Sequence, residues 1–270
     1  MKRIIAALSF FTRLPFWKIT KLEKKHYQNL VPLWPMAGWL TGSVMAITFS
    51  FFSLIMPNNM AVILAIIMRI LLTGALHEDG FADFWDGFGG GNDRQSVLKI
   101  MKDSNVGTYG VLALVLYFFL LYNTLSGYFD FASLKYCDAS ELTQKMGFID
   151  NLKIASIFIV ADPFSKWLSS NIINILPYAR NENEAKNKLV YNKMHLMDKV
   201  MCFIFGVLPA VIFIKPLLLI AFFVASLVAM TMILVFYKKI KGYTGDCCGA
   251  CFIITELFFY ITSFILIYCF

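Results

Sequence analysis

Five acidic or imidazole side chains are crowded into ten positions of the stretch HEDGFADFWDGFGGG, residues 77 to 91. Asp79, Asp83 and Asp86 are spaced i, i+4 and i+7, so on a helix their carboxylates project from one face. Like charges at i, i+4 destabilise an isolated helix by about 0.2–0.5 kcal/mol per pair, and a cation would offset that repulsion. Mg²⁺ is commonly held by one or two carboxylates plus substrate phosphates. The spacing predicts that these three residues bind Mg²⁺, against the alternative of a solvated polar helix face.

Glycines and basic residues follow the acids. The four glycines between 87 and 91 have backbone amides that can approach an anion closely, although glycines also serve turns. The donors beyond them are Arg94, Lys99, Lys102, Ser104, Asn105 and Thr108. Acids, glycines and donors within the 34 residues from 77 to 110 predict a site for Mg²⁺ and a phosphate.

His77 and Glu78 flank the acidic stripe. An imidazole can accept a proton in general base catalysis, so His77 is a candidate for that role. A histidine at the membrane-facing end of a helix is an equally good interpretation. Glu78 is a further possible ligand beside the three aspartates.

A second polar segment is KGYTGDCCGA, residues 241 to 250. Asp246 is its one acid and lies between Gly245 and Gly249, so it is either a fourth carboxylate for the same metal or part of a turn between helices. The C-C-x-x-C pattern beside it has no second cysteine pair or histidine cluster to complete a tetrahedral metal site. We interpret these cysteines as small buried apolar side chains.

The composition indicates what must position these residues. Hydrophobic residues make up 59% of the 270, charged residues 15%, and the mean hydropathy is +0.68, which is typical of an integral membrane protein. Nearly uncharged runs cover 36–56, 60–75, 107–129, 154–178, 200–214, 217–237 and 250–270. They predict an all-α, polytopic transmembrane bundle of about seven spans, forming one domain over residues 1–270. A run without proline from Leu71 to Phe88 predicts that the second span continues as helix through the acids.

The basic residues predict the orientation of the bundle. With the N-terminus in the cytoplasm, the inside segments hold 18 of the 24 lysines and arginines. These segments are 1–35, 76–106, 178–199 and 238–249. Both polar segments then open on the cytoplasm. The net charge of +7 is explained by topology and anionic membrane lipid, or by attraction of a phosphorylated substrate; no nucleic-acid motif is present.

Four ionisable residues lie within predicted spans. Asp162 and Lys166 are i, i+4 and are expected to pair, whereas Arg69 and Glu256 lack a partner nearby in the sequence. A charge in a span costs about 2.5–3.5 kcal/mol on insertion scales, so each should face the bundle interior. Structural pairing is the default interpretation, and contact with a substrate is the alternative, most of all for Arg69.

Several motifs together resemble one known family. FFTRLP (10–15), GALHEDGFADFWDGFGGG (74–91), IMKDSNVGTYGVLAL (100–114) and GYTGDCCGA (242–250) are similar in order and spacing to the cobalamin synthase family, the adenosylcobinamide-GDP ribazoletransferases. The resemblance implies a Mg²⁺-dependent enzyme of the bacterial cytoplasmic membrane. Its substrates would be adenosylcobinamide-GDP and α-ribazole or its 5′-phosphate, and its products adenosylcobalamin or its 5′-phosphate and GMP. That family usually has leucine where Glu78 stands, which favours the aspartates as ligands.

The implied reaction is attack by a ribose hydroxyl on the cobinamide-side phosphorus of a pyrophosphate. Such chemistry needs charge neutralisation and in-line positioning more than a protein nucleophile. The expected catalytic residues are His77, Asp79, Asp83 and Lys102, and the expected Mg²⁺ ligands are Asp79, Asp83, Asp86 and Asp246. The expected substrate-binding residues are Arg13, Arg69, Gly89, Gly90, Arg94, Lys102, Ser104 and Thr244. His77 or one of the aspartates would accept the hydroxyl proton.

Two other functional classes of membrane protein are alternatives to this family. A phosphotransferase of the CDP-alcohol type shares an Asp-Gly opening, but the later D-x-x-x-D motif does not follow it. A cation transporter would need charged residues at mid-membrane in several spans. Oligomeric state, the base of the acceptor and the number of Mg²⁺ ions are not predicted.

Overall fold

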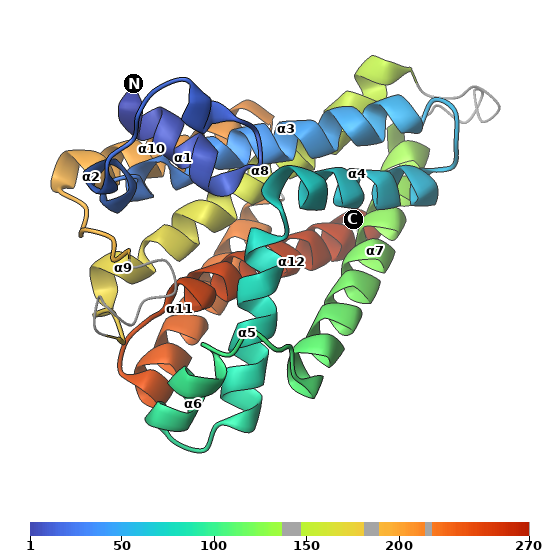
Figure 1. Ribbon diagram of the computed structural model, residues 1–270. Helices are drawn as coiled ribbons and strands as arrows, with labels where there is room; N and C mark the ends of the chain where they lie inside the picture. The colour runs from blue at the N-terminus through green and yellow to red at the C-terminus, as the bar shows by residue number, and fades with distance from the viewer. Residues whose placement is uncertain (137–146, 181–188, 214–217, 270) are drawn as a thin grey trace.

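The computed structural model describes residues 1–136, 147–180, 189–213 and 218–269, and nearly all of this chain is helical (Figure 1). The α-helices are α1 (Lys2–Phe11), α2 (Lys24–Gln28), α3 (Trp34–Phe52), α4 (Asn58–Thr73), α5 (Leu76–Gly90), α6 (Arg94–Ile100), α7 (Thr108–Tyr136), α8 (Phe148–Ser170), α9 (Ile172–Ile175), α10 (Leu196–Phe213), α11 (Leu219–Ile240) and α12 (Gly245–Cys269). Two 3-10 turns are η1 (Phe16–Lys18) and η2 (Val31–Leu33). Within the described residues, strand-like pairing is limited to one bridge between Tyr178 and Tyr243.

Five described helices are long and apolar enough to cross a membrane. They cover Val31–Phe52, Thr108–Leu134, Leu196–Phe213, Leu219–Ile240 and Gly245–Cys269, and α4 with α5 makes a sixth if that bent pair is one span. The predicted all-α, multi-pass bundle is confirmed. The remaining predicted span is α8, which is 23 residues long but carries Asp150, Lys153, Asp162 and Lys166.

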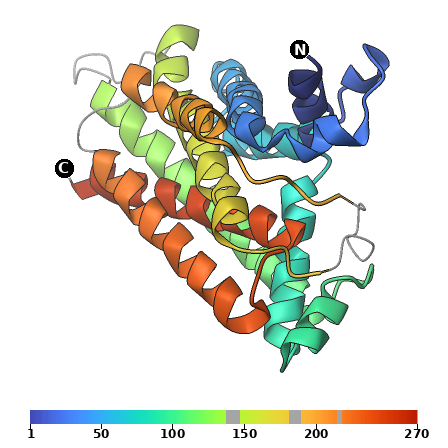
Figure 2. The same ribbon diagram turned by 90° about the vertical axis from the view of Figure 1, so that its left-hand side faces the viewer.

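The spans divide into inner and outer helices. About 61% of the apolar stretch of α12 is buried inside the protein, against 28% for α7, 22% for α10 and 28% for α11. α12 packs against α5, α7, α8 and α11, and it runs through the middle of the bundle in both views (Figures 1 and 2). The outer helices present large apolar side chains outward, for example Phe119, Val211 and Phe223. In a multi-pass protein these surfaces face lipid.

A sharp bend separates α4 from α5, at 89° (Figure 1). Gly74 and Ala75 are both left-handed, with φ of 67° and 58°, and both donate their N–H groups to the carbonyl of Ile70. The prediction of one continuous helix from Leu71 to Phe88 is therefore wrong. Glycine enters the left-handed region without steric cost and ends the helix, so the acids begin a helix of their own.

α5 and α12 cross closely where each carries a glycine. A methyl group on Gly80 would lie 3.1 Å from the Cα of Asp246, and one on Gly249 would lie 3.3 Å from the carbonyl oxygen of His77. Small residues let helix backbones approach in this way. The crossing brings the first turn of α5 against the first turn of α12.

Candidate active site

A cavity of about 290 Å³ lies where α5 and α12 cross. Its walls come from α1, the start of α3, α5, α8, the segments around residues 178–180 and 189–191, and the start of α12. The lining residues are Phe10, Phe11, Trp34, Leu76, His77, Asp79, Gly80, Lys166, Ser169, Tyr178, Arg180, Leu189, Tyr191, Gly245, Asp246, Cys248, Gly249 and Phe252. Apolar residues with a few convergent polar groups are typical of a small-molecule site.

Two carboxylates meet in this cavity. Asp79 lies in the first turn of α5 and Asp246 in the first turn of α12. Thr244 supports Asp246: its fully buried hydroxyl donates to Asp246 Oδ2 over 3.4 Å and accepts the N–H of Cys247 over 3.3 Å. Thr244 does not line the cavity, so the structure gives this predicted substrate-binding residue a supporting position instead. The predicted meeting of the two polar segments is confirmed for this pair.

The other two predicted carboxylate ligands, Asp83 and Asp86, do not line the cavity. Asp86 caps α7, because its two oxygens accept the N–H groups of Gly107 (2.7 Å) and Gly110 (2.8 Å). A methyl group on Gly110 would collide with that carboxylate, so the glycines of the GTYG sequence allow the capping. Asp83 is buried and does not line the cavity. Within the described part of the chain, no three His, Cys, Asp or Glu side chains lie close enough together to hold a metal ion.

Asp79 and Asp246 nevertheless match the way in which proteins commonly bind Mg²⁺. Mg²⁺ keeps several waters and takes one or two protein carboxylates plus substrate phosphates, rather than a cage made entirely of protein ligands. Two carboxylates that open on a cavity at a helix crossing match that donor set. Two of the four predicted ligands thus line the cavity, and Mg²⁺ binding itself stays a prediction.

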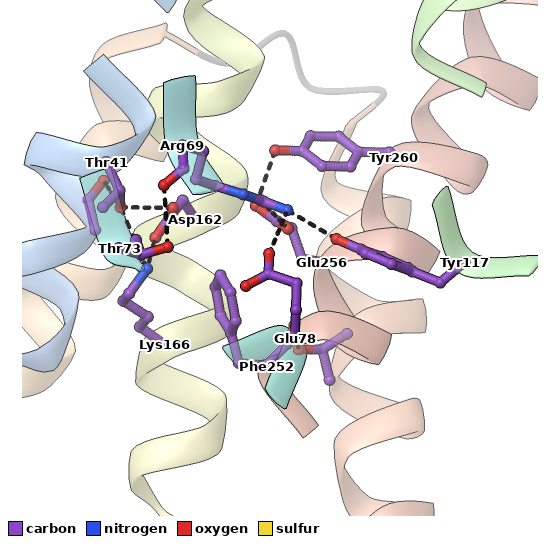
Figure 3. A network of polar contacts seen from close by, with 12 residues as sticks. Thr41, Arg69, Thr73, Glu78, Tyr117, Asp162, Lys166, Phe252, Glu256 and Tyr260 are labelled. Atoms are coloured by element: carbon purple, nitrogen blue, oxygen red, sulfur yellow. Dashed lines mark hydrogen bonds and ion pairs between the residues drawn. The ribbon is translucent and has the colours of Figure 1, made fainter. Parts of the chain in front are cut away.

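Two cations line the same cavity. Lys166 pairs with Asp162 and also donates to Thr41 Oγ1 over 3.2 Å, while Thr41 donates to the other oxygen of Asp162 over 2.6 Å (Figure 3). The Lys166 ammonium lies 4.1 Å from the ring centre of Phe252. The predicted pairing of Asp162 with Lys166 is confirmed. The second cation, Arg180, donates to the carbonyl of Leu98 over 2.9 Å while it lines the cavity.

His77 lies between aromatic rings on the cavity wall. Its imidazole stacks on Phe11 at 5.7 Å and 17°, and lies 4.3 Å from the ring centre of Phe252. Its Nε2 atom is buried and has no hydrogen-bond partner among the described residues. The position agrees with the predicted base, and because His77 lies in the first turn of α5, the alternative of a histidine at a helix end stays open.

Arg69 belongs to a closed network instead of the cavity (Figure 3). Its guanidinium pairs with Glu256 at 2.6 Å, donates to the Tyr117 hydroxyl at 2.7 Å and lies 3.7 Å from Glu78. Tyr260 donates to the second oxygen of Glu256 over 3.0 Å. We call these five residues the Arg69 network. Structural pairing, the default interpretation, is confirmed for Arg69 and Glu256, whose partnership spans 187 positions of sequence.

The glycines and basic residues that the sequence predicts as phosphate-binding do not line the cavity. Gly89 and Gly90 lie in the last turn of α5, so their N–H groups belong to the helix ladder and are not turned toward an anion. Arg94 donates to the carbonyls of Ile240 and Ala179, both at 2.8 Å, and so joins α6 to the end of α11. Lys102 and Ser104 are exposed in the connection between α6 and α7 and do not line the cavity.

Arg13 is also outside the cavity. It is exposed and packs on the bend, where its N–H donates to the carbonyl of Leu72 over 2.7 Å and its side chain lies against Gly74. A side chain at position 74 would collide with Arg13, which is a second reason for glycine there. The FFTRLP motif therefore supports the geometry of the bend.

Sequence reasoning missed several cavity residues. Trp34 had no recognisable motif around it, and Arg180 and Tyr191 lie in the predicted cytoplasmic segment 178–199, of which 181–188 fall outside the described residues. Burial raises the pKa of the Tyr191 phenol well above its usual value, so this side chain stays neutral. The one available signal was the aromatic content of these segments, which is unremarkable in a chain with 27 phenylalanines.

Comparisons with known proteins identify the family of this chain. The family model of cobalamin-5-phosphate synthase matches residues 3–264. A protein named adenosylcobinamide-GDP ribazoletransferase from Leptospira interrogans is 31% identical over 265 residues, covering 96% of this chain and 93% of its own length. One of the same name from Shewanella amazonensis is 32% identical over 275 residues, with 98% and 96% covered. No solved structure is significantly similar. The chain belongs to the cobalamin-5-phosphate synthase family.

Proposed function

We propose that this protein is an adenosylcobinamide-GDP ribazoletransferase of the bacterial cytoplasmic membrane. It joins adenosylcobinamide-GDP to α-ribazole or α-ribazole 5′-phosphate, and it releases GMP. A ribose hydroxyl oxygen bonds to the cobinamide-side phosphorus, and the bond from that phosphorus to the GMP oxygen breaks. The observation that carries this proposal is the meeting of Asp79 and Asp246 in one cavity of a chain of this family.

The carboxylate pair supplies the metal-binding side of the site. Asp79 and Asp246 would hold Mg²⁺, which when bound neutralises charge on a pyrophosphate and orients it. Asp83 stays a predicted ligand one turn along α5, whereas Asp86 is committed to capping α7.

Positive groups in the same cavity supply the phosphate-binding side. The N-termini of α5 and α12 both open here, and the first N–H groups of a helix favour an anion. Lys166 and Arg180 add two cations, and they take the role that the sequence had assigned to Lys102 and Arg94. Because Lys166 is held by Asp162 and Thr41, its ammonium is oriented before any ligand binds.

His77 is the best-placed group to accept the proton of the attacking hydroxyl. It lines the cavity two positions before Asp79, and its ring is clamped between Phe11 and Phe252. A clamped imidazole keeps its nitrogen in place for the transfer. A carboxylate of the Asp79 and Asp246 pair is the competing acceptor.

The cavity also supports the predicted orientation. Its lining residues come from all four segments that the basic residues place in the cytoplasm, represented by Phe10, Asp79, Arg180 and Asp246. These segments are far apart in the sequence and meet at one end of the bundle. The active site would therefore open on the cytoplasm, where nucleotide substrates are present.

GMP release tests the proposal. The purified protein in detergent, given adenosylcobinamide-GDP, α-ribazole and titrated Mg²⁺, should form GMP and the joined corrinoid in equal amounts. Asp79→Asn and Asp246→Asn should abolish most of this turnover and weaken its dependence on Mg²⁺. Near wild-type turnover and Mg²⁺ dependence in both variants would contradict the assignment.

A further inference from the structure

One side of the cavity is aromatic, and the phosphate chemistry does not use it. Phe10 and Phe11 at the end of α1, Trp34 at the start of α3, and Tyr191 line this side, and we call them the aromatic wall. Their rings meet edge to face, with centroids 5.1 Å apart for Phe10 and Phe11, 5.7 Å for Phe11 and Trp34, and 5.5 Å for Trp34 and Tyr191. Because each ring is packed against the next, the wall exists before a ligand arrives.

The aromatic wall leads directly to the groups that would do the chemistry. Phe11 stacks on His77, and His77 precedes Asp79 by two residues on α5. A ligand whose planar group lies on the wall would have its next group beside the imidazole, and the carboxylates of Asp79 and Asp246 line the same cavity. A base, a ribose hydroxyl and the attacked phosphorus would fit these three places.

We infer that the aromatic wall binds the planar base of the acceptor riboside and that Trp34 selects a base of the benzimidazole type. The inference rests on the proposed function, since it assigns one substrate of that reaction to one side of the cavity. Stacking of a base on aromatic side chains contributes about 1–3 kcal/mol per base.

The size of the cavity favours the acceptor over the corrinoid. A volume of about 290 Å³ lies at the lower end of the range for small-molecule pockets. It holds a base with its ribose but not a corrin ring, whose large apolar surface must remain outside. The donor would therefore reach the cavity with its pyrophosphate while its corrin ring stays outside.

The polar groups of the wall favour a benzimidazole over guanine. The Nε1 atom of Trp34 is buried and has no hydrogen-bond partner among the described residues, and an indole N–H can only donate. The base of a benzimidazole riboside has one free ring nitrogen, which only accepts. Guanine carries an amino group and a ring N–H, and the wall offers them one acceptor, the Tyr191 hydroxyl, so at least one donor would lie against phenylalanine rings without a partner, at a cost of about 1–3 kcal/mol.

Separate Michaelis constants for the two substrates test the wall. Phe10→Leu keeps an apolar side chain at a half-buried position and removes the ring, so the KM for α-ribazole should rise about tenfold, in line with the loss of one stacking contact. The KM for adenosylcobinamide-GDP and the kcat should stay near wild type. The matched control is Phe119→Leu, which removes a ring from the exposed face of α7 and should change neither constant.

An isosteric acceptor tests Trp34. The α-riboside of dimethylindole replaces the free ring nitrogen by C–H and keeps the shape of the base. Wild type should prefer the benzimidazole riboside in kcat/KM by about fivefold to tenfold, the worth of one hydrogen bond to a buried donor. Trp34→Phe keeps a ring but removes the N–H, and it should abolish this preference.

Three outcomes would overturn the inference. A rise in the KM for adenosylcobinamide-GDP alone in Phe10→Leu would place guanine on the wall. Unchanged KM values for both substrates would mean that the wall binds no base, and an equal preference in wild type and Trp34→Phe would remove the role of Trp34.

Failure of the proposed function would look different, because wild type would release no GMP. Calorimetric titration of wild type and Phe10→Leu with α-ribazole alone would then decide on the wall. Weaker binding in the variant would support it, and equal or absent binding would overturn it.

Discussion

The first turn of α5 faces two charged clusters of opposite character. Glu78 points into the Arg69 network, where every charged group is buried and faces a charge or hydroxyl of another helix (Figure 3). Asp79, the next residue, is exposed and opens on the cavity with Lys166 and Arg180. Successive residues on a helix project about 100° apart, so one turn serves both clusters.

The Arg69 network supports the fold, whereas the cavity residues are placed to take part in the reaction. The Arg69 network joins α4, α5, α7 and α12, the helices that fix the bend and the crossing. Its charges pair with one another in an interior where an unpaired charge is costly, and Arg69 Nε and Glu78 Oε2 are left without a hydrogen-bond partner among the described residues. The cavity leaves Asp79 accessible to a ligand, while Lys166 lines it as a buried side chain paired with Asp162. Substitutions in the two clusters should therefore act on different quantities.

The largest expected effect is on turnover. Asp79→Asn should lower kcat by roughly 100-fold or more, the range seen when one group that stabilises developing charge is removed. The thermal unfolding temperature of this variant in detergent should change little, because the Asp79 side chain is exposed to solvent. A large fall in unfolding temperature would mean that Asp79 has a structural role, and it would contradict the distinction between the Arg69 network and the cavity.

Arg69→Met should act on stability. Removing the guanidinium leaves Glu256 buried without its cation, and breaking a buried pair in this way costs about 3–5 kcal/mol. Chemical unfolding in detergent micelles measures the loss, and Tyr117→Phe, which removes one hydrogen bond to Arg69, should lose only about 1 kcal/mol. A stable but inactive Arg69→Met protein would support the alternative of direct substrate contact.

Gly80→Ala tests the crossing that brings the carboxylates together. Its added methyl group would lie 3.1 Å from the Asp246 Cα, so α5 and α12 must separate at a cost of about 1–3 kcal/mol. Turnover should fall with stability, since Asp79 and Asp246 would move apart. Gly245→Ala is the control for stability, because a methyl group there meets nothing within 4 Å. Equal stability of both variants would show that the crossing is not tight.

Asp86→Asn separates capping from metal binding. Asparagine offers one oxygen where Asp86 uses two, so α7 should lose one capping bond and about 1–2 kcal/mol of stability. Turnover should remain well above that of Asp79→Asn, and the apparent affinity for Mg²⁺ should be unchanged. A weakened Mg²⁺ dependence with normal stability would restore Asp86 to the ligand set.

The smallest effect is expected at the end of α5. Gly90→Ala fits without a close contact, the nearest atom being a methyl carbon of Ile100 at 3.5 Å. Alanine in place of a helical glycine should stabilise by roughly 0.5–1 kcal/mol, and GMP release should be unchanged. A clear rise in the KM for the nucleotide substrate would support the predicted role of Gly89 and Gly90 in binding phosphate.

Local patterns predicted the parts of this protein that depend on neighbours in sequence. The apolar runs identify the helices because a span needs about 20 such residues, and the i, i+4 spacing of Asp162 and Lys166 pairs them on one face. Two predictions at glycines were wrong. Gly74 ends α4, although the helix was expected to continue, and Gly89 and Gly90 lie within α5, although the predicted helix reached only Phe88. Glycine is compatible with both outcomes, and packing chooses between them.

By itself the sequence determined the membrane class, the all-α bundle, the family motifs and the two polar segments, since each of these is a matter of composition or short-range spacing. Only the tertiary structure decided which acids share a cavity. Asp79 meets Asp246 through a crossing at Gly80 and Gly249, and Asp86 turns to the amides of α7 although it lies on the same stripe. It also decided that Arg69 pairs with Glu256, and that Trp34 and Tyr191 complete the cavity. These contacts join residues far apart in the chain, and their partners are set by the angles at which helices pack.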